Sequence, residues 1–156
     1  MAGPKALDLS IIIATRNRAQ SLAKALDSIT KLNISFDQIE IIIADNGSRD
    51  STSVVCEMYG NIFPHFKYIF DPRPGQLIGW HRALFEANAE ILAFIDDDVR
   101  PTPGWAKCAL ECFESPEIGI ATGRIIPEFE QRPPSWQNQM VLENSLGIWS
   151  ALWGML

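Results

Sequence analysis

The chain has 156 residues, enough for one compact domain with a hydrophobic core, and its 47% hydrophobic and 21% charged residues are typical of a globular protein. The formal net charge is −6, and no cluster of lysine and arginine stands out, which excludes a nucleic-acid groove or a polybasic membrane patch as the expected function. The three cysteines lack nearby ligands for a zinc site, so we expect reduced thiols packed as small apolar side chains and a cytoplasmic location.

Runs of β-branched residues alternate with stretches of helical periodicity along the chain. Residues 9–14 are apolar on both faces, as in a buried parallel strand. Apolar residues at 22, 25, 26 and 29 then follow helical spacing, with Asn17 as a candidate cap. Further strands are expected over 39–44, 66–70, 91–95 and 118–122, and further helices from Asp50 or Ser51 toward Tyr59, over 78–89 and over 105–114.

This alternation predicts an α/β fold with a Rossmann-like, mostly parallel sheet and helices on both faces. Ligands of such sheets bind outside the carboxyl ends of the strands. Polar residues follow the expected strands at those ends: 15–18 after the first, 45–46 after the second and 96–98 after the fourth. The pattern therefore gathers these residues at one edge of the sheet.

The aspartate triplet 96–98 gives the strongest chemical signal. In an extended strand end, Asp96 and Asp98 would point the same way, about 6.6 Å apart, and Asp97 the other way. Two like charges at that distance repel by about 2.5 kcal/mol at an effective dielectric constant of about 20. A divalent cation shared with a diphosphate would remove this repulsion, and carboxylate oxygens suit Mg²⁺ or Mn²⁺. The alternative is a solvated acidic loop that ends a strand.

Weaker candidates surround the triplet. Asp45 follows an apolar strand and is able to accept a hydrogen bond from a ligand N–H, although aspartate is also common in turns. Arg82 lies on the predicted helix before the triplet, within reach of a phosphate or simply at the surface, and Thr15 ends the first strand. The sequence contains neither a P-loop motif nor a G-x-G-x-x-G turn, which leaves a metal ion to carry phosphate binding.

Four segments together resemble family 2 glycosyltransferases, over roughly residues 8 to 125. Residues 9–18 are similar to the family's first strand and P-T-x-N-R turn, with Ala14 where proline is usual. Residues 42–52 match its V-D-[DN]-G-S-x-D-x-T segment, and residues 79–84 resemble its A-R-N-x-G helix with departures. Residues 91–99 match its D-x-D motif in the form h-h-F-[LI]-D-D-D-V.

The resemblance implies a GT-A fold, a nucleoside-diphosphate-sugar donor, a divalent metal and inversion at the anomeric carbon. It implies that Asp45 binds the nucleobase, that Thr15 lies beside the nucleoside and that Asp96 lies near the ribose. Asp98 would hold the metal together with Asp96, and Asp97 and, more weakly, Arg82 would complete the nucleotide-binding set. These residues define a donor-binding core over residues 1–127, and the sugar, the nucleotide and the acceptor (a saccharide, a lipid or a protein) stay open.

The family's catalytic base is usually a carboxylate in an E-D pair, and the chain contains no E-D dipeptide. Glu128, Glu130 and Glu143 lack a matching context, so no base is assigned. Two alternatives stay open: a nucleotidyltransferase, which would want a glycine-rich loop after the first strand, and a non-catalytic nucleotide-sugar-binding module.

Residues 128–156 are expected to begin an incomplete acceptor-side region. The uncharged segment 146–156 contains Trp149 and Trp153, four residues apart, and is too short to span a bilayer. We expect it to mediate dimerisation or contact with an acceptor half, with packing on this domain or docking on a membrane surface as alternatives.

Overall fold

The computed structural model describes residues 7–73 and 75–129. The chain divides into two compact units, residues 1–119 and 120–156. Every strand and helix described below lies in the first unit. Within the described residues, none of the helices has the length and apolar character that a membrane span requires.

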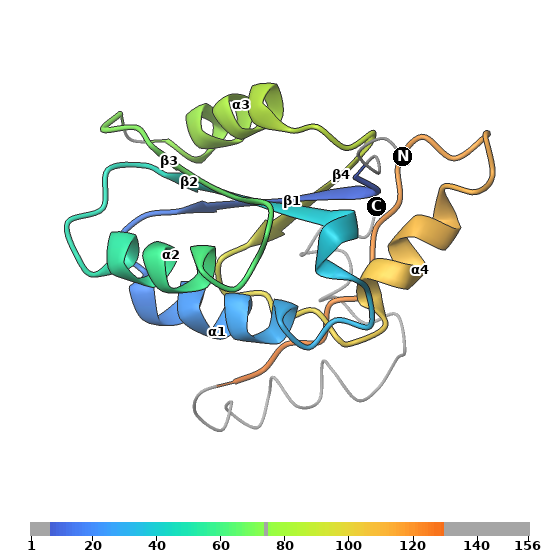
Figure 1. The fold of residues 1–156 in the computed structure, drawn as a ribbon, viewed down its shortest axis with the longest axis horizontal. Helices are drawn as coiled ribbons and strands as arrows, with labels where there is room; N and C mark the ends of the chain where they lie inside the picture. Colours follow the sequence, from blue (N-terminus) through green and yellow to red (C-terminus); the bar gives the residue numbers. More distant parts are fainter. Residues whose placement is uncertain (1–6, 74, 130–156) are drawn as a thin grey trace, which may run out of the picture. The chain divides into compact units, whose positions relative to one another are not determined.

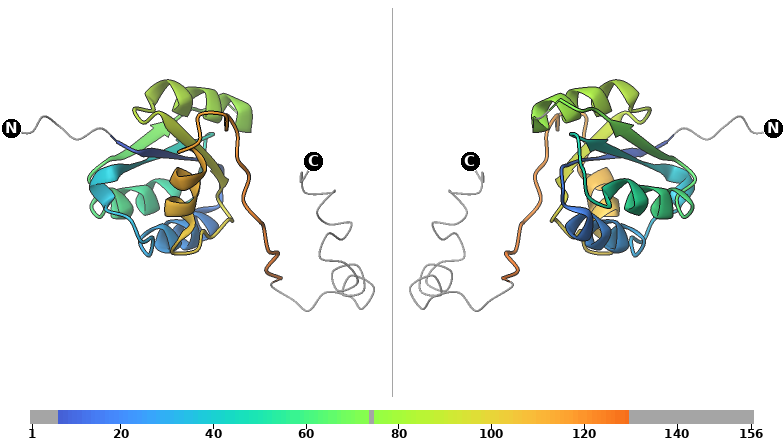
Figure 2. Two further views of the ribbon diagram at one scale, coloured as in Figure 1. Left: turned by 90° about the vertical axis from the view of Figure 1, so that its right-hand side faces the viewer. Right: turned by 90° about the vertical axis from the view of Figure 1, so that its left-hand side faces the viewer.

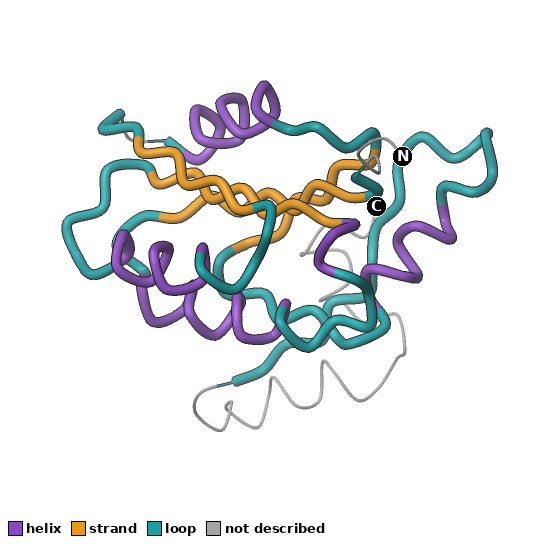
Figure 3. Tube along the Cα trace, in the orientation of Figure 1, coloured by secondary structure: helices purple, strands orange, loops and turns teal. Residues whose placement is uncertain are grey.

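A parallel four-stranded sheet forms the centre of the first unit, as the sequence predicts. Its strands are β1 (Leu9–Thr15), β2 (Ile39–Asp45), β3 (Phe66–Phe70) and β4 (Ile91–Asp96), in the order β3-β2-β1-β4 (Figure 1; orange in Figure 3). Each neighbouring pair is parallel, and Ala14 lies opposite both Ala44 and Asp96. The carboxyl ends of the three strands β2, β1 and β4 are therefore level.

Helices cover both faces of this sheet, because the central strands are apolar on both sides. The helices are α1 (Ala19–Ile29), α2 (Thr52–Gly60), α3 (Gln76–Glu86) and α4 (Trp105–Cys112), with a short 3₁₀ helix at Phe36–Gln38. Figure 2 shows α1 and α2 on one face and α3 on the other. Ile11 and Ile13 pack in the cluster that also contains Leu22 and Leu26, whereas Ile12 packs in the cluster under α3.

Three expectations about local structure are wrong. Residues 118–122 form no strand, because a strand needs a backbone partner and these residues pair with none of the described strands. Asn17 does not cap α1, since the Ala19 N–H donates instead to the Asp50 carboxylate at 3.0 Å. Of the three cysteines, which are all free, only Cys56 is buried, while the other two are exposed on α4.

The helix after β3 is also displaced from its expected range. It begins at Gln76 and ends at Glu86, whereas the sequence predicts 78–89. The residues after Glu86 have another role. The Asn88 and Ala89 backbone N–H groups donate hydrogen bonds to a buried carboxylate.

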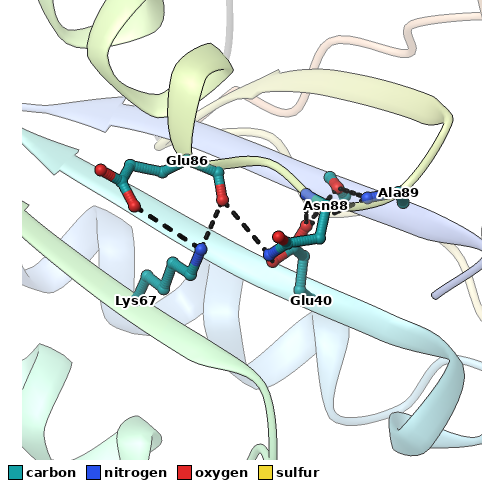
Figure 4. A network of polar contacts seen from close by, with 6 residues as sticks. Glu40, Lys67, Glu86, Asn88 and Ala89 are labelled. Atoms are coloured by element: carbon teal, nitrogen blue, oxygen red, sulfur yellow. Dashed lines mark hydrogen bonds and ion pairs between the residues drawn. The ribbon is translucent and has the colours of Figure 1, made fainter. Parts of the chain in front are cut away.

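That carboxylate belongs to Glu40 at the amino end of β2, where it is 1% exposed (Figure 4). It accepts hydrogen bonds from the Ser10 hydroxyl at 2.6 Å, from the Asn88 backbone and side-chain amides, and from the Ala89 N–H. Burial alone would raise the pKa of Glu40, but the hydrogen bonds outweigh it and lower the pKa. Glu40 thus ties β1, β2 and the α3–β4 connection together at the amino end of the sheet.

Candidate functional site

A cavity of about 340 Å³ opens at the opposite, carboxyl end of the sheet. Its walls come from the ends of β1, β2 and β4 and from the start of α3. The lining residues are Ala14, Thr15, Arg16, Arg18, Asn46, Gly75, Gln76, Asp96, Asp97 and Asp98. The expected convergence of Thr15 with the aspartate triplet is therefore present, since parallel strands bring their carboxyl ends to one edge.

Asp97 is the buried member of the triplet, at 4% exposure. Its carboxylate accepts a hydrogen bond from the Thr15 hydroxyl at 2.7 Å and pairs with Arg18 at 2.9 Å. Burial raises the pKa of Asp97, and the contacts with Thr15 and Arg18 only partly offset that effect. Thr15 thus joins β1 to the turn after β4 and fixes one carboxylate in the cavity wall.

Asp96 and Asp98 are exposed at the same cavity, but not on one extended strand face. The expectation of extended geometry is wrong because β4 ends at Asp96, and the Val99 N–H donates to the Asp96 carbonyl at 3.1 Å to close a turn. The Gln76 side-chain amide donates to Asp96 at 3.0 Å, and Arg18 donates to Asp98 at 2.8 Å. The turn therefore gives each carboxylate of the triplet a different partner set.

Arg18 is the cation that the sequence reasoning missed. Its guanidinium bridges Asp97 and Asp98, and its hydrogen bond to Asp98, opposed by burial, raises the pKa of Arg18. Arg18 also lines a second hollow of about 400 Å³ between the starts of α1 and α2, together with Asp50. The only sign of this role in the sequence is a basic residue three positions after Thr15, and one of its two partners, Asp98, lies 80 residues away.

The cavity offers hard oxygen donors for a divalent cation. In the described residues, no group of three or more histidine, cysteine, aspartate or glutamate side chains is arranged to hold a metal ion. Mg²⁺ in nucleotide sites is typically held by one or two carboxylates together with substrate phosphates and water. Asp96 and Asp98 at the cavity wall fit that chemistry, and Asp98 is paired with Arg18 at 2.8 Å.

Asp45 and Asn46, adjacent in sequence, have different surroundings. Asp45 is 1% exposed, and its oxygens accept hydrogen bonds from the Ser48 N–H and the Tyr68 hydroxyl, both at 2.7 Å. It does not line the cavity, whereas Asn46 does. The Asn46 side-chain oxygen is buried and has no hydrogen-bond partner among the described residues, which is uncommon for a buried polar atom.

Arg82 is placed away from this cavity. It lies on the exposed side of α3, 3.7 Å from the carboxylate of Asp71, which Arg73 also contacts at 2.6 Å. The hydrogen bonds from Arg73, reinforced by the charge of Arg82, hold the pKa of Asp71 well below its usual range. Of the other sequence candidates, Glu128 belongs to the second unit, and Glu130, Glu143 and segment 146–156 lie outside the described residues.

Comparisons with known proteins agree with the geometry of the sheet. The chain is 22% identical over 118 residues to glycosyltransferase AglE of Haloferax volcanii, an alignment that covers 75% of this chain and 39% of AglE. The structure of S. aureus TarS 1–349 in complex with UDP-GlcNAc matches with a TM-score of 0.65 and 22% identity, over 78% of this chain and 37% of that one.

A second solved structure is the mannosyltransferase PcManGT of Pyrobaculum calidifontis in complex with GDP-Man and Mn²⁺. It matches with a TM-score of 0.55 and 23% identity, over 60% of this chain and 28% of that one. These likenesses confirm the expected GT-A fold. The chain spans well under half the length of each of these proteins. The sequence model of glycosyl transferase family 2 matches residues 10–155, and the chain belongs to that family.

Proposed function

We propose that this chain is the donor-binding part of an inverting glycosyltransferase, which binds a nucleoside-diphosphate sugar together with Mn²⁺ or Mg²⁺. The observation that carries the proposal is the cavity of about 340 Å³ at the carboxyl end of the sheet, which brings Thr15, Asn46 and the triplet 96–98 together. The GDP-Man and Mn²⁺ of PcManGT and the UDP-GlcNAc of TarS support this donor class.

Asp98 and Asp96 are the proposed ligands of the cation. Both carboxylates are exposed at the cavity, so they are accessible without unfolding any element. When bound, the cation supplies electrostatic stabilisation of the negative charge that develops on the departing diphosphate. Thr15 and Arg18 hold Asp97, and this arrangement keeps the turn after β4 in place while the two neighbouring carboxylates bind.

We propose Asn46, rather than Asp45, as the contact for the nucleobase. Asp45 already uses both oxygens to hold the turn after β2 and the Tyr68 hydroxyl. Asn46 carries an amide whose oxygen has no partner within residues 7–73 and 75–129, and an amide offers a donor and an acceptor to a base edge. Asp45 then acts indirectly, by fixing the backbone that presents Asn46.

A thermal-unfolding panel of nucleoside diphosphates, with Mn²⁺ and with EDTA, tests the proposal. A ligand at 100 times its Kd adds about 2.7 kcal/mol of stability, which raises the Tm by roughly 5–10 °C for a chain of this size. We expect one or more diphosphates to give this shift with Mn²⁺ and a much smaller one with EDTA. If no nucleoside diphosphate shifts the Tm in either condition, the donor-binding proposal is wrong.

A further inference from the structure

Gly79 occupies an unusual place for a glycine, within α3 rather than at an end of that helix. Glycine in a helix interior costs about 1 kcal/mol relative to alanine. Gly79 is buried, and its backbone φ is not in the left-handed region, so helical geometry itself does not require glycine here. A packing reason must therefore account for the missing side chain.

The neighbours of Gly79 supply that reason. A Cβ built on Gly79 would lie 2.7 Å from the Asn46 side-chain oxygen, 3.0 Å from the Asn46 side-chain nitrogen and 3.1 Å from the Ala44 Cβ. A Cβ at this position would thus contact both the oxygen and the nitrogen of the Asn46 amide. Both distances are at or below the closest approach that such atoms tolerate. The amide therefore lies directly against the bare backbone of α3.

Packing is what holds this amide in place. The Asn46 backbone N–H donates to the Thr15 carbonyl at 2.9 Å and so continues the β1–β2 pairing by one residue. The side-chain oxygen, in contrast, has no hydrogen-bond partner in the described part of the chain. With the backbone anchored and the side-chain oxygen unpaired within the described residues, the place of the amide in the cavity wall depends on the space that Gly79 leaves.

We propose that Gly79 is a positioning residue for nucleotide binding, which acts by setting the place of the Asn46 amide in the cavity wall. This inference rests on the proposed function of the cavity. A methyl group at position 79 displaces the Asn46 amide and also makes a tight contact with the Ala44 Cβ at 3.1 Å, and the higher helix propensity of alanine offsets the cost of that contact. The substitution should thus alter binding far more than folding.

The test compares Gly79→Ala with Gly104→Ala, because a Cβ on Gly104 meets nothing within 4 Å. UDP and GDP are titrated with MnCl₂ into the full chain by calorimetry. We expect Gly79→Ala to bind about tenfold more weakly, the loss of roughly one hydrogen bond, with a nearly unchanged Tm. Gly104→Ala should bind like the parent.

Asn46→Ala distinguishes positioning from general damage to the helix. In the Asn46→Ala background, Gly79→Ala should cause no further loss of affinity, because the group that it displaces is gone. A second readout needs no nucleotide: the Asn46 side-chain amide signal in a ¹⁵N NMR spectrum should shift in Gly79→Ala and stay in place in Gly104→Ala. If Gly79→Ala alone fails to fold, the double variant should fold again.

These measurements distinguish a failure of the proposed role of Gly79 from a failure of the donor-binding proposal. A parent chain that binds neither nucleotide overturns the donor-binding proposal, and the role of Gly79 with it. A parent that binds, together with a Gly79→Ala variant of equal affinity or an unmoved Asn46 signal, overturns only the role of Gly79. An equal loss from Gly79→Ala with and without Asn46 would show damage that does not pass through the amide, and would also overturn it.

Discussion

The two ends of the sheet treat a buried carboxylate in opposite ways. At the amino end, Glu40 accepts hydrogen bonds from three residues, and together they lower its pKa. At the carboxyl end, Asp97 is similarly buried, yet burial raises its pKa despite Thr15 and Arg18. Two further aspartates lie beside Asp97 in the cavity wall, and the Asn46 oxygen has no partner among the residues that the structure describes.

This difference indicates a division of labour along the same strands. A fully hydrogen-bonded buried carboxylate stabilises the fold and specifies how the elements meet. A cluster of like charges and an unpaired amide destabilise the fold. Such groups are found at functional sites, where a ligand supplies the missing partners. The amino end is therefore the frame, and the carboxyl end is the binding edge.

The largest expected effect comes from Asp98→Ala at the binding edge. Losing one of two proposed carboxylate ligands should weaken Mn²⁺-dependent binding of a nucleoside diphosphate by at least about 100-fold, since even groups that only orient a metal ligand contribute 10–100-fold. The Tm without metal should change little, because one like charge is removed from the triplet. Calorimetry with Mn²⁺ and with EDTA measures this, and Asp37→Ala, an exposed aspartate outside the cavity, is the matched control.

Retained Mn²⁺-dependent affinity in Asp98→Ala would remove Asp98 from the metal site. The same measurement on Asp97→Asn then asks whether the buried member of the triplet is the ligand instead.

Glu40→Gln should reduce stability, not binding. The neutral amide fits the same space but replaces one acceptor oxygen by an N–H donor that faces another donor, which costs about 1–3 kcal/mol in a buried site. Because the pKa of Glu40 is lowered in the folded state, its contribution is fully present above the unfolded carboxyl pKa of 4.5 and is lost as the pH falls through the folded value. Urea unfolding from pH 7 to pH 3 should thus show a shallower acid loss in Glu40→Gln than in the parent.

Equal acid sensitivity in both proteins would mean that the Glu40 hydrogen bonds contribute nothing net. Nucleotide affinity at pH 7 should be the same in both, and a large loss in Glu40→Gln would break the separation between frame and binding edge.

Arg18→Gln should have the smallest effect, and one of opposite sign for the metal. Arg18 pairs with Asp98, where both side chains are about half exposed and the pair contributes at most about 1 kcal/mol. Arg18 also pairs with the buried Asp97, which keeps its hydrogen bond from Thr15 when Arg18 is replaced. Without the charge of Arg18, Mn²⁺ alone should bind severalfold more tightly, as measured by electron paramagnetic resonance of free Mn²⁺. Arg16→Gln is the control, because Arg16 lines the same cavity but forms no ion pair with the described residues. An unchanged or weaker Mn²⁺ affinity in Arg18→Gln would contradict this competition.

The sequence predicts the strands of the sheet well, because the spacing of apolar residues along the chain indicates which segments are buried strands. Uninterrupted runs such as 9–14 identify buried parallel strands, and they place the triplet 96–98 and Thr15 at one edge. The run 118–122 has a similar composition but no partner strand in the part of the chain that the structure describes, and pairing is a property of the fold rather than of the run. The apolar pattern also does not predict where β4 ends. Residues after Asp96 form a turn, in which Asp98 accepts a hydrogen bond from Arg18, 80 residues away in the sequence.

The finer assignments at the binding edge depend on contacts between segments distant in sequence. Local composition does not predict the hydrogen bond from the Tyr68 hydroxyl to Asp45. It also does not predict that the Asn46 amide lies against the backbone of Gly79. Arg82 has the right charge and helix, yet it lies beside Asp71 rather than at the cavity. These choices are made by packing, so a single sequence does not determine them.

The most direct test of the account is where Mn²⁺ binds along the sheet. In a ¹⁵N NMR titration with Mn²⁺ and a nucleoside diphosphate, paramagnetic broadening should begin at Thr15, Asn46 and the turn 96–99. The signals of Glu40, Asn88 and Ala89 should persist, because seven-residue strands place that end about 20 Å away. Substitution of Mg²⁺ for Mn²⁺ should keep the shifts and remove the broadening. Broadening that begins at the Glu40 end, or that is uniform over the chain, would contradict the assignment of the carboxyl end as the binding edge.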